Sequence, residues 1–159
     1  MKMEQASDYK GVYANILGNN IAPELKGVMF LYPYNNGTIV EIEVINMPKD
    51  ESHPYALHIH EGSSCDNGNF DSAKGHYNPT NKPHPMHSGD LPPLFSNDGY
   101  SYMRLFTNRF TPEEVVGKTV IIHNGSDDFK TQPSGDSGAK MACGLIVDSN
   151  DTRQEFYFN

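Results

Sequence analysis

The chain has 159 residues, of which 20% are charged, and a formal net charge of −8 at pH 7. A chain of this length can bury about 70% of its unfolded surface, so we expect one domain over residues 1–159. The acidic balance argues against nucleic acid or an anionic membrane as a partner, because both need clustered Lys and Arg.

The sequence contains no run of 18 apolar residues, so no membrane span is predicted. Residues 1–7 lack the apolar stretch of a signal peptide. This polar start also fits a chain from which an export or anchoring segment has been removed.

Short segments of β type dominate the chain. They are rich in β-branched and aromatic residues and are bounded by Gly, Pro, Asn or Asp. They comprise residues 9–17, 26–34, 38–46, 55–60, 100–107, 118–123 and 144–147. We therefore predict an all-β fold, an antiparallel sandwich or barrel. A single helical turn is expected at residues 111–114, because TPEE has the cap, Pro and acidic first turn of a helix start.

The segment 38–46 shows how a strand would face the core. Val40, Ile42 and Val44 alternate with two glutamates, which predicts one buried and one solvent-facing side. The preceding Asn-Asn-Gly at 35–37 is typical of a tight turn, since Asn and Gly accept positive φ easily. The first half is therefore expected to begin with a hairpin or meander.

Two stretches, residues 61–97 and 124–142, do not read as strands. Loops of that length are unusual inside a compact domain unless a metal or cross-link orders them. Both stretches carry candidate ligands. Metal binding would therefore explain both the length of these loops and the spacing of the histidines.

Six of the seven histidines are spaced as ligands for two metal ions. His58 and His60 are two apart on a predicted strand, so both can reach one ion. His123 ends another apolar segment and can approach a metal held by a neighbouring strand. For any one of these residues a surface or structural role remains an alternative. His53, outside every cluster, is expected to be structural.

A second group lies in the Pro-rich segment KPHPMHSGDLPP. His84, His87 and Asp90 suit a closed tetrahedral zinc site if a fourth ligand arrives, and His76 is the natural candidate. The prolines limit chain entropy and favour the bound arrangement. A Pro/His-rich loop with weak adventitious metal affinity is the alternative.

The chain has two cysteines, Cys65 and Cys143. They would be free thiols in a reducing compartment or one disulfide in an exported protein, and spacing alone does not decide.

Five motifs resemble the copper/zinc superoxide dismutase family, in order along residues 57–146. They are HIHE (58–61), GHYNP (75–79), GDL (89–91), VIIH (120–123) and ACG (142–144). The resemblance implies a Greek-key β-sandwich or barrel of about eight antiparallel strands, with two long metal-site loops.

The resemblance also implies a set of site residues. Copper would be bound by His58, His60, His76 and His123, and zinc by His76, His84, His87 and Asp90, with His76 as the bridge. Asp127 would bond one copper and one zinc histidine, with Asp128 less favoured. A Cys65–Cys143 disulfide would favour an extracytoplasmic location.

One position departs from the family pattern. Three residues before the second cysteine the family has Arg, whereas this chain has Lys140. Lys keeps the charge but lacks the planar fork that binds an anion at two points. Between His123 and Cys143 three aspartates outnumber the two lysines, so steering of an anion should be weak.

The resemblance thus predicts disproportionation of superoxide, a small-molecule substrate, to oxygen and hydrogen peroxide, slower than the family norm, by a monomer or homodimer. The alternative is a noncatalytic superoxide dismutase-like zinc/copper-binding protein of the cell envelope. A zinc hydrolase is less favoured, since Asp90 would complete the zinc ligand set.

Overall fold

The computed structural model describes residues 9–66 and 68–150. The polar start, residues 1–7, and most of the tail after residue 148 lie outside the described residues. Within these ranges no helix is long and apolar enough to cross a membrane.

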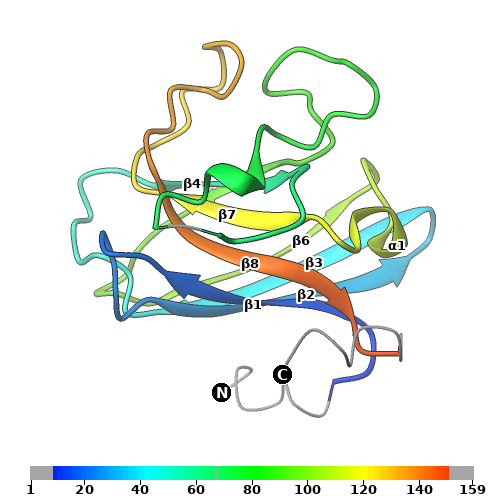
Figure 1. Ribbon diagram of the computed structural model, residues 1–159, viewed down its shortest axis with the longest axis horizontal. Coiled ribbons are helices and arrows are strands. Elements are labelled where there is room, and N and C mark those ends of the chain that lie inside the picture. Colours follow the sequence, from blue (N-terminus) through cyan, green and yellow to red (C-terminus); the bar gives the residue numbers. More distant parts are fainter. Residues whose placement is uncertain (1–8, 67, 151–159) are drawn as a thin grey trace.

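Eight strands form one antiparallel sheet that curls into a nearly closed barrel (Figure 1). They are β1 (Val12–Gly18), β2 (Lys26–Tyr34), β3 (Gly37–Ile45), β4 (Tyr55–His60), β5 (Asp90–Leu94), β6 (Ser101–Thr107), β7 (Thr119–His123) and β8 (Lys140–Asp148). Their order is β5-β4-β7-β8-β1-β2-β3-β6, and the two edge strands, β5 and β6, contact each other. The predicted all-β fold of about eight antiparallel strands is confirmed.

The strand order has Greek-key crossovers. After β3 the chain crosses to build β4 and β5, and then returns to place β6 beside β3. Strand β7 pairs with β4 on one side and β8 on the other. The crossovers bring the histidine-bearing strands β4 and β7 side by side.

The core follows the alternation expected from the sequence. Val40, Ile42 and Val44 of β3 are fully buried in the main apolar cluster. The predicted turn at 35–37 joins β2 to β3, with Tyr34 paired to Gly37 and Asn35 at φ 50°. The single helical turn is also present as α1 (Pro112–Val115), with a capping box between Thr111 and Glu114.

The prediction that the two glutamates of this strand face solvent was wrong. Glu41 and Glu43 lie on the outer face of β3, but both are buried. The hydroxyl of Tyr102 donates to Glu41 (2.7 Å) and that of Tyr100 donates to Glu43 (3.1 Å). Long side chains of the neighbouring strands cover the outer face, which strand alternation alone does not reveal.

The first long stretch is more structured than expected. It contains a 3₁₀ turn, η2 (Asp71–Ala73), and the strand β5. The sequence of this strand, DLPPL, did not predict a strand because it contains two prolines. Prolines are tolerated there because β5 is an edge strand. Strand β8 begins at Lys140, so the second loop ends at residue 139.

Both long loops rise from one side of the barrel (Figure 1). The described ends of the chain meet on the opposite side, where the Ser149 hydroxyl donates to the carbonyl oxygen of Tyr9 (2.9 Å). The candidate ligands are therefore gathered at the loop side of the barrel.

Candidate metal centre

Three imidazoles are positioned by paired strands. His58 and His60 lie on β4 and His123 ends β7, and all three are buried. Because β4 and β7 are neighbours, the His58 and His123 ring centroids are 5.0 Å apart. The Nε2 atoms of His60 and His123 are 3.3 Å apart.

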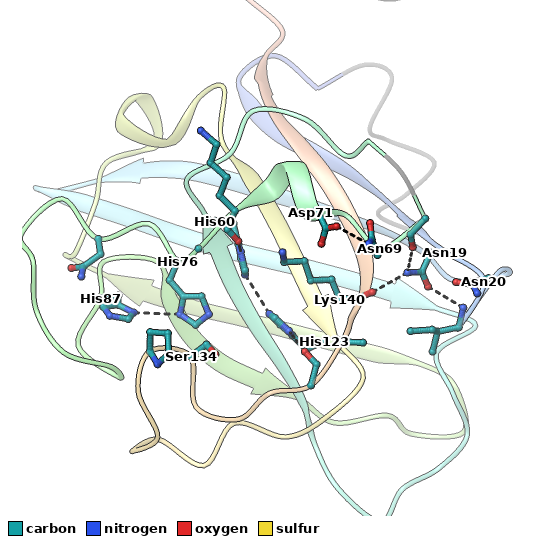
Figure 2. Close-up of a pocket in the computed structure, with 18 residues that line it drawn as sticks. Asn19, Asn20, His60, Asn69, Asp71, His76, His87, His123, Ser134 and Lys140 are labelled. Carbon is teal, nitrogen blue, oxygen red and sulfur yellow. Dashed lines mark hydrogen bonds between the residues drawn. The ribbon is translucent and has the colours of Figure 1, made fainter.

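The His76 ring stands between this trio and a second group. Its backbone forms a β-bridge with His60, and its ring centroid is 4.0 Å from that of His58. On its other side the Nδ1 atom lies 2.8 Å from Asp90 Oδ1 and 3.3 Å from His87 Nδ1. Figure 2 shows His76 between His60 and His87.

The second group is completed by the Pro-rich loop and the first residue of β5. The Nδ1 atoms of His84 and His87 lie 3.1 and 3.2 Å from Asp90 Oδ2. The backbone N–H of His87 also donates to Asp90 Oδ2 (3.0 Å).

Two sets of four residues can therefore each hold a metal ion, because within each set one donor atom per residue lies within 4.8 Å of the others. The sets are His58, His60, His76 and His123, and His76, His84, His87 and Asp90. His76 belongs to both. A group of three residues, His58, His84 and Asp127, meets the same distance criterion.

Hydrogen bonds on the far side of the rings set their orientation. His60 Nδ1 donates to the Lys74 carbonyl (2.8 Å) and His123 Nδ1 to that of Gly138 (3.1 Å). Asp127 accepts from the Nε2 atoms of His58 and His84, both at 2.8 Å. These partners fix which ring nitrogen is left free for a metal.

The nitrogens left free fit a metal. Among the buried side-chain nitrogens of the described residues, His58 Nδ1, His76 Nε2 and His84 Nδ1 lack a hydrogen-bond partner; His84 Nδ1 lies near Asp90 Oδ2 but does not hydrogen bond to it. Buried polar atoms are rarely left unpaired, because desolvation without a partner is costly. Imidazole with one carboxylate is a donor set for copper and zinc.

Burial also keeps these donors in the form that binds metal. It lowers the pKa of His58 and His60, and lowers the pKa of His123 to about 3. Burial alone would raise the pKa of Asp127, but the hydrogen bonds from His58 and His84 outweigh it and lower that pKa. His58, His60 and His123 are thus neutral and Asp127 is ionised at pH 7.

The two candidate aspartates of the second loop have different roles. Asp127 is buried against His58 and His84 as described above, whereas Asp128 is exposed. Asp128 accepts the backbone N–H groups of Lys130 (2.9 Å) and Thr131 (2.8 Å). It shapes the loop without touching an imidazole ring.

Cys65 and Cys143 form a disulfide, with a Cα–Cα distance of 5.8 Å. It joins the first long loop to β8 and packs in a small cluster with Phe70, Ala73 and Ile121. The alternative of two free thiols is thereby excluded.

An open pocket of about 730 Å³ leads to the imidazoles of the first set. His60, His76 and His123 line it, together with Lys140 at the start of β8 (Figure 2). The Asn19 amide donates to the Lys140 carbonyl (2.9 Å), which fixes the backbone of that strand end.

Sequence reasoning missed three residues at this site: Lys74, Gln132 and Arg109. Lys74 borders the pocket and has φ 61° and ψ −147°, a backbone region that only Gly adopts easily. The Gln132 side chain bonds both the N–H (2.9 Å) and the carbonyl (2.8 Å) of His84. Of these three residues, only Lys74 could have been suspected from the sequence, because it lies two residues before the predicted ligand His76.

The comparisons with known proteins agree with this geometry. Residues 25–146 match the family described as copper/zinc superoxide dismutase. The chain belongs to the copper/zinc superoxide dismutase family. It is 33% identical to a copper/zinc superoxide dismutase of Aquifex aeolicus, over 70% of this chain and 74% of that protein. Copper and zinc are the cofactors of this family.

Members named dismutase-like are similar as well. The superoxide dismutase-like protein YojM of Bacillus subtilis is 37% identical over 60% of this chain and 56% of that protein. A crystal structure of a superoxide dismutase-like protein from the same organism superposes with a TM-score of 0.71 and 28% identity, covering 85% of this chain and 97% of that chain. The enzyme of Brucella abortus gives 0.69 and 25%, covering 86% and 99%.

Proposed function

We propose that this protein disproportionates superoxide to oxygen and hydrogen peroxide at a histidine-bridged copper/zinc site. The observation that carries the proposal is the His76 ring, which belongs to both four-residue sets. A protein that only stored or carried one metal would not need a ring shared between two sites.

The two sets divide between the metals as the family pattern implies. Copper would be held by His58, His60, His76 and His123, and zinc by His76, His84, His87 and Asp90. Bound copper supplies the one-electron exchange with superoxide, whereas zinc has no accessible redox change and supplies charge and order.

The chain's own residues prepare this chemistry. The carbonyls of Lys74 and Gly138 hold His60 and His123 with Nε2 free, and Asp127 orients His58 and His84 together. Two superoxide ions and two protons give one oxygen and one hydrogen peroxide. We place one of those protons at His76 Nε2, which is buried and has no hydrogen-bond partner.

We further propose that Lys140 attracts and docks the anion in the pocket. Its ammonium is a point charge, so it binds a diatomic anion less well than a planar guanidinium would. Asp71 lines the same pocket and opposes that charge, whereas Lys74 at its border adds to it. Turnover slower than the family norm follows, and Lys140→Arg should accelerate superoxide decay.

The test is to measure copper and zinc stoichiometry and superoxide decay on the same sample. Replacing His60 by Ala should remove copper and activity while zinc remains, because His60 belongs only to the copper set. His53→Ala is the matched control, since its ring Nδ1 bonds the Pro54 carbonyl outside both sets. Full activity in the His60 variant would refute the assignment.

The second candidate is a noncatalytic zinc/copper-binding protein of the cell envelope. The lysine at position 140 and the similarity to YojM favour it. Bound zinc with no copper and no superoxide decay in the wild-type protein would support this alternative.

We also propose that residues 1–159 form one domain, as a monomer or homodimer, outside the cytoplasm. The disulfide and the bacterial and extracellular relatives support the location. Fractionation of the producing cells, with thiol trapping of Cys65 and Cys143, checks it.

A further inference from the structure

The guanidinium of Arg109 lies against the backbone of the zinc-side loop. Arg109 is in the connection between β6 and α1. Its Nη1 atom donates to the carbonyls of Pro85 (3.1 Å), His87 (3.2 Å) and Asp90 (3.3 Å). Two of these three carbonyls belong to residues of the zinc-side set.

No carboxylate within residues 9–66 and 68–150 forms an ion pair with Arg109. Its charge is therefore directed at carbonyl oxygens, and a charged donor makes a stronger hydrogen bond than a neutral one. Fixing the carbonyls of His87 and Asp90 restricts their backbone dihedrals. The directions in which their side chains leave the chain are restricted as well.

Gln132 provides a second tether on the same loop, but from a different part of the molecule. It bonds both backbone groups of His84 from within the second long loop. Gln132 thus joins the ligand loop to the second long loop, whereas Arg109 joins it to the short connection between β6 and α1.

We propose that Arg109 is a positioning residue that holds the zinc-side ligands near their metal-bound arrangement before zinc arrives. The inference deepens the proposed function and rests on its assignment of His76, His84, His87 and Asp90 to zinc. Binding energy at an unformed site is partly used to order the site, so preformed ligands give tighter binding.

The test uses the copper-free full chain and zinc(II) in competition with a chromophoric chelator. Arg109→Gln should weaken zinc binding about 10- to 100-fold, the usual effect of losing a residue that supports metal ligands. The matched control is Arg104→Gln, which removes an exposed cation of β6 that faces Glu41 and leaves the loop intact. Its zinc affinity should equal that of the wild-type protein.

Cobalt(II) in place of zinc gives a spectroscopic readout of the same site. The visible bands of tetrahedral cobalt should weaken in Arg109→Gln. Arg109→Lys should recover much of the signal, because an ammonium can also donate to several carbonyls. Copper affinity should change less than zinc affinity, since three of the four copper-set imidazoles lie on strands and only His76 comes from this loop.

Two results would overturn the proposal: wild-type zinc affinity in Arg109→Gln, or an equal loss of copper and zinc affinity, which would mean a global effect. If Arg109→Gln does not fold, amide exchange of the metal-free wild-type protein decides. The N–H groups of Met86, His87 and Asp90 are hydrogen bonded and should exchange slowly; unprotected exchange refutes preorganisation.

The zinc and cobalt measurements do not depend on turnover. A wild-type protein that binds both metals but leaves superoxide unchanged would defeat the proposed function. The effect of Arg109 on zinc binding would still stand.

Discussion

The proposed copper-side and zinc-side ligand sets are built in different ways. His58, His60 and His123 are carried by paired strands, so sheet geometry alone brings their rings together. His76, His84 and His87 come from a long loop, in which His76 forms a β-bridge with His60 whereas His84 and His87 lie in no strand or bridge. The comparison teaches that a strand-held site is ordered by the fold, whereas a loop-held site needs added tethers.

Three kinds of tether serve the loop. A disulfide joins its first part to β8, Arg109 and Gln132 hold the backbone around the ligands, and Asp127 bonds a ring of each set. Each tether can be removed separately, which allows the difference between the two sets to be tested.

Acid should affect the copper side most, and this is the largest expected effect. In the metal-free protein burial holds the pKa of His58, His60 and His123 below the value of about 6.5 expected on unfolding. Above pH 6.5 both states are neutral, so these groups contribute nothing to the pH dependence. Below pH 6.5 the unfolded chain binds protons that the folded chain does not. For each group, stability then falls by up to about 1.4 kcal/mol per pH unit until the pH reaches the folded-state pKa of that group.

The carboxylates add a loss at lower pH. The pKa of Asp127 is lowered in the folded state, so its contribution is complete above about pH 4 and disappears as pH falls further. Urea unfolding of the metal-free protein between pH 7.5 and 5 measures the first phase. His123→Gln should flatten it, and an unchanged slope in that variant would contradict the assignment.

Removing the disulfide tests the first tether. The bridge closes a loop with a sequence separation of 78, so Cys65→Ser with Cys143→Ser should lower the stability of the metal-free protein by about 4 kcal/mol. Urea unfolding measures the loss. Amide exchange should rise in residues 61–75 more than in the barrel strands, and uniform acceleration throughout the chain would argue against a local tether.

Replacing Asp127 tests whether the two sets are coupled. Asp127→Ala frees one ring on each side, so both copper and zinc should bind about 10- to 100-fold more weakly. Asp128→Ala is the control, because it alters the loop without releasing a ring. Loss of affinity for one metal only would show that Asp127 does not couple the two sets.

Lys74 should give the smallest effect. Its backbone lies in a region that costs about 1–3 kcal/mol for a residue with a side chain, and glycine removes that strain but gains unfolded-state entropy. Lys74→Gly should therefore stabilise the metal-free protein by about 1 kcal/mol, as judged by urea unfolding. It should also slow superoxide decay at low ionic strength, because it removes a cation that borders the pocket. Lys74→Gln, which keeps the strain, should lose only rate.

The fold was largely predictable because its signals are local. Alternation identified β3, and Asn-Asn-Gly identified the turn before it. Strand β5 was not predicted because it contains two consecutive prolines. The burial of Glu41 was not predicted because the tyrosines that cover it come from β2 and β6, which are far apart in the sequence.

Some residues of the site could be predicted from the sequence alone, whereas others could not. The spacing of His58 and His60 places them on one face of a strand without any knowledge of a family. The pairing of Cys65 with Cys143 could not be derived from spacing, and its prediction depended on the resemblance. Arg109 and Gln132 gave no signal, since each acts on backbone groups at least 19 residues away in the sequence.

The meeting of the described chain ends has a practical consequence. Tyr9 and Ser149 lie on the side of the barrel away from the two loops (Figure 1). A tether attached beyond either residue would leave the pocket facing the surrounding liquid. The molecule should therefore tolerate immobilisation on an electrode or bead through either end while small anions keep free access to it.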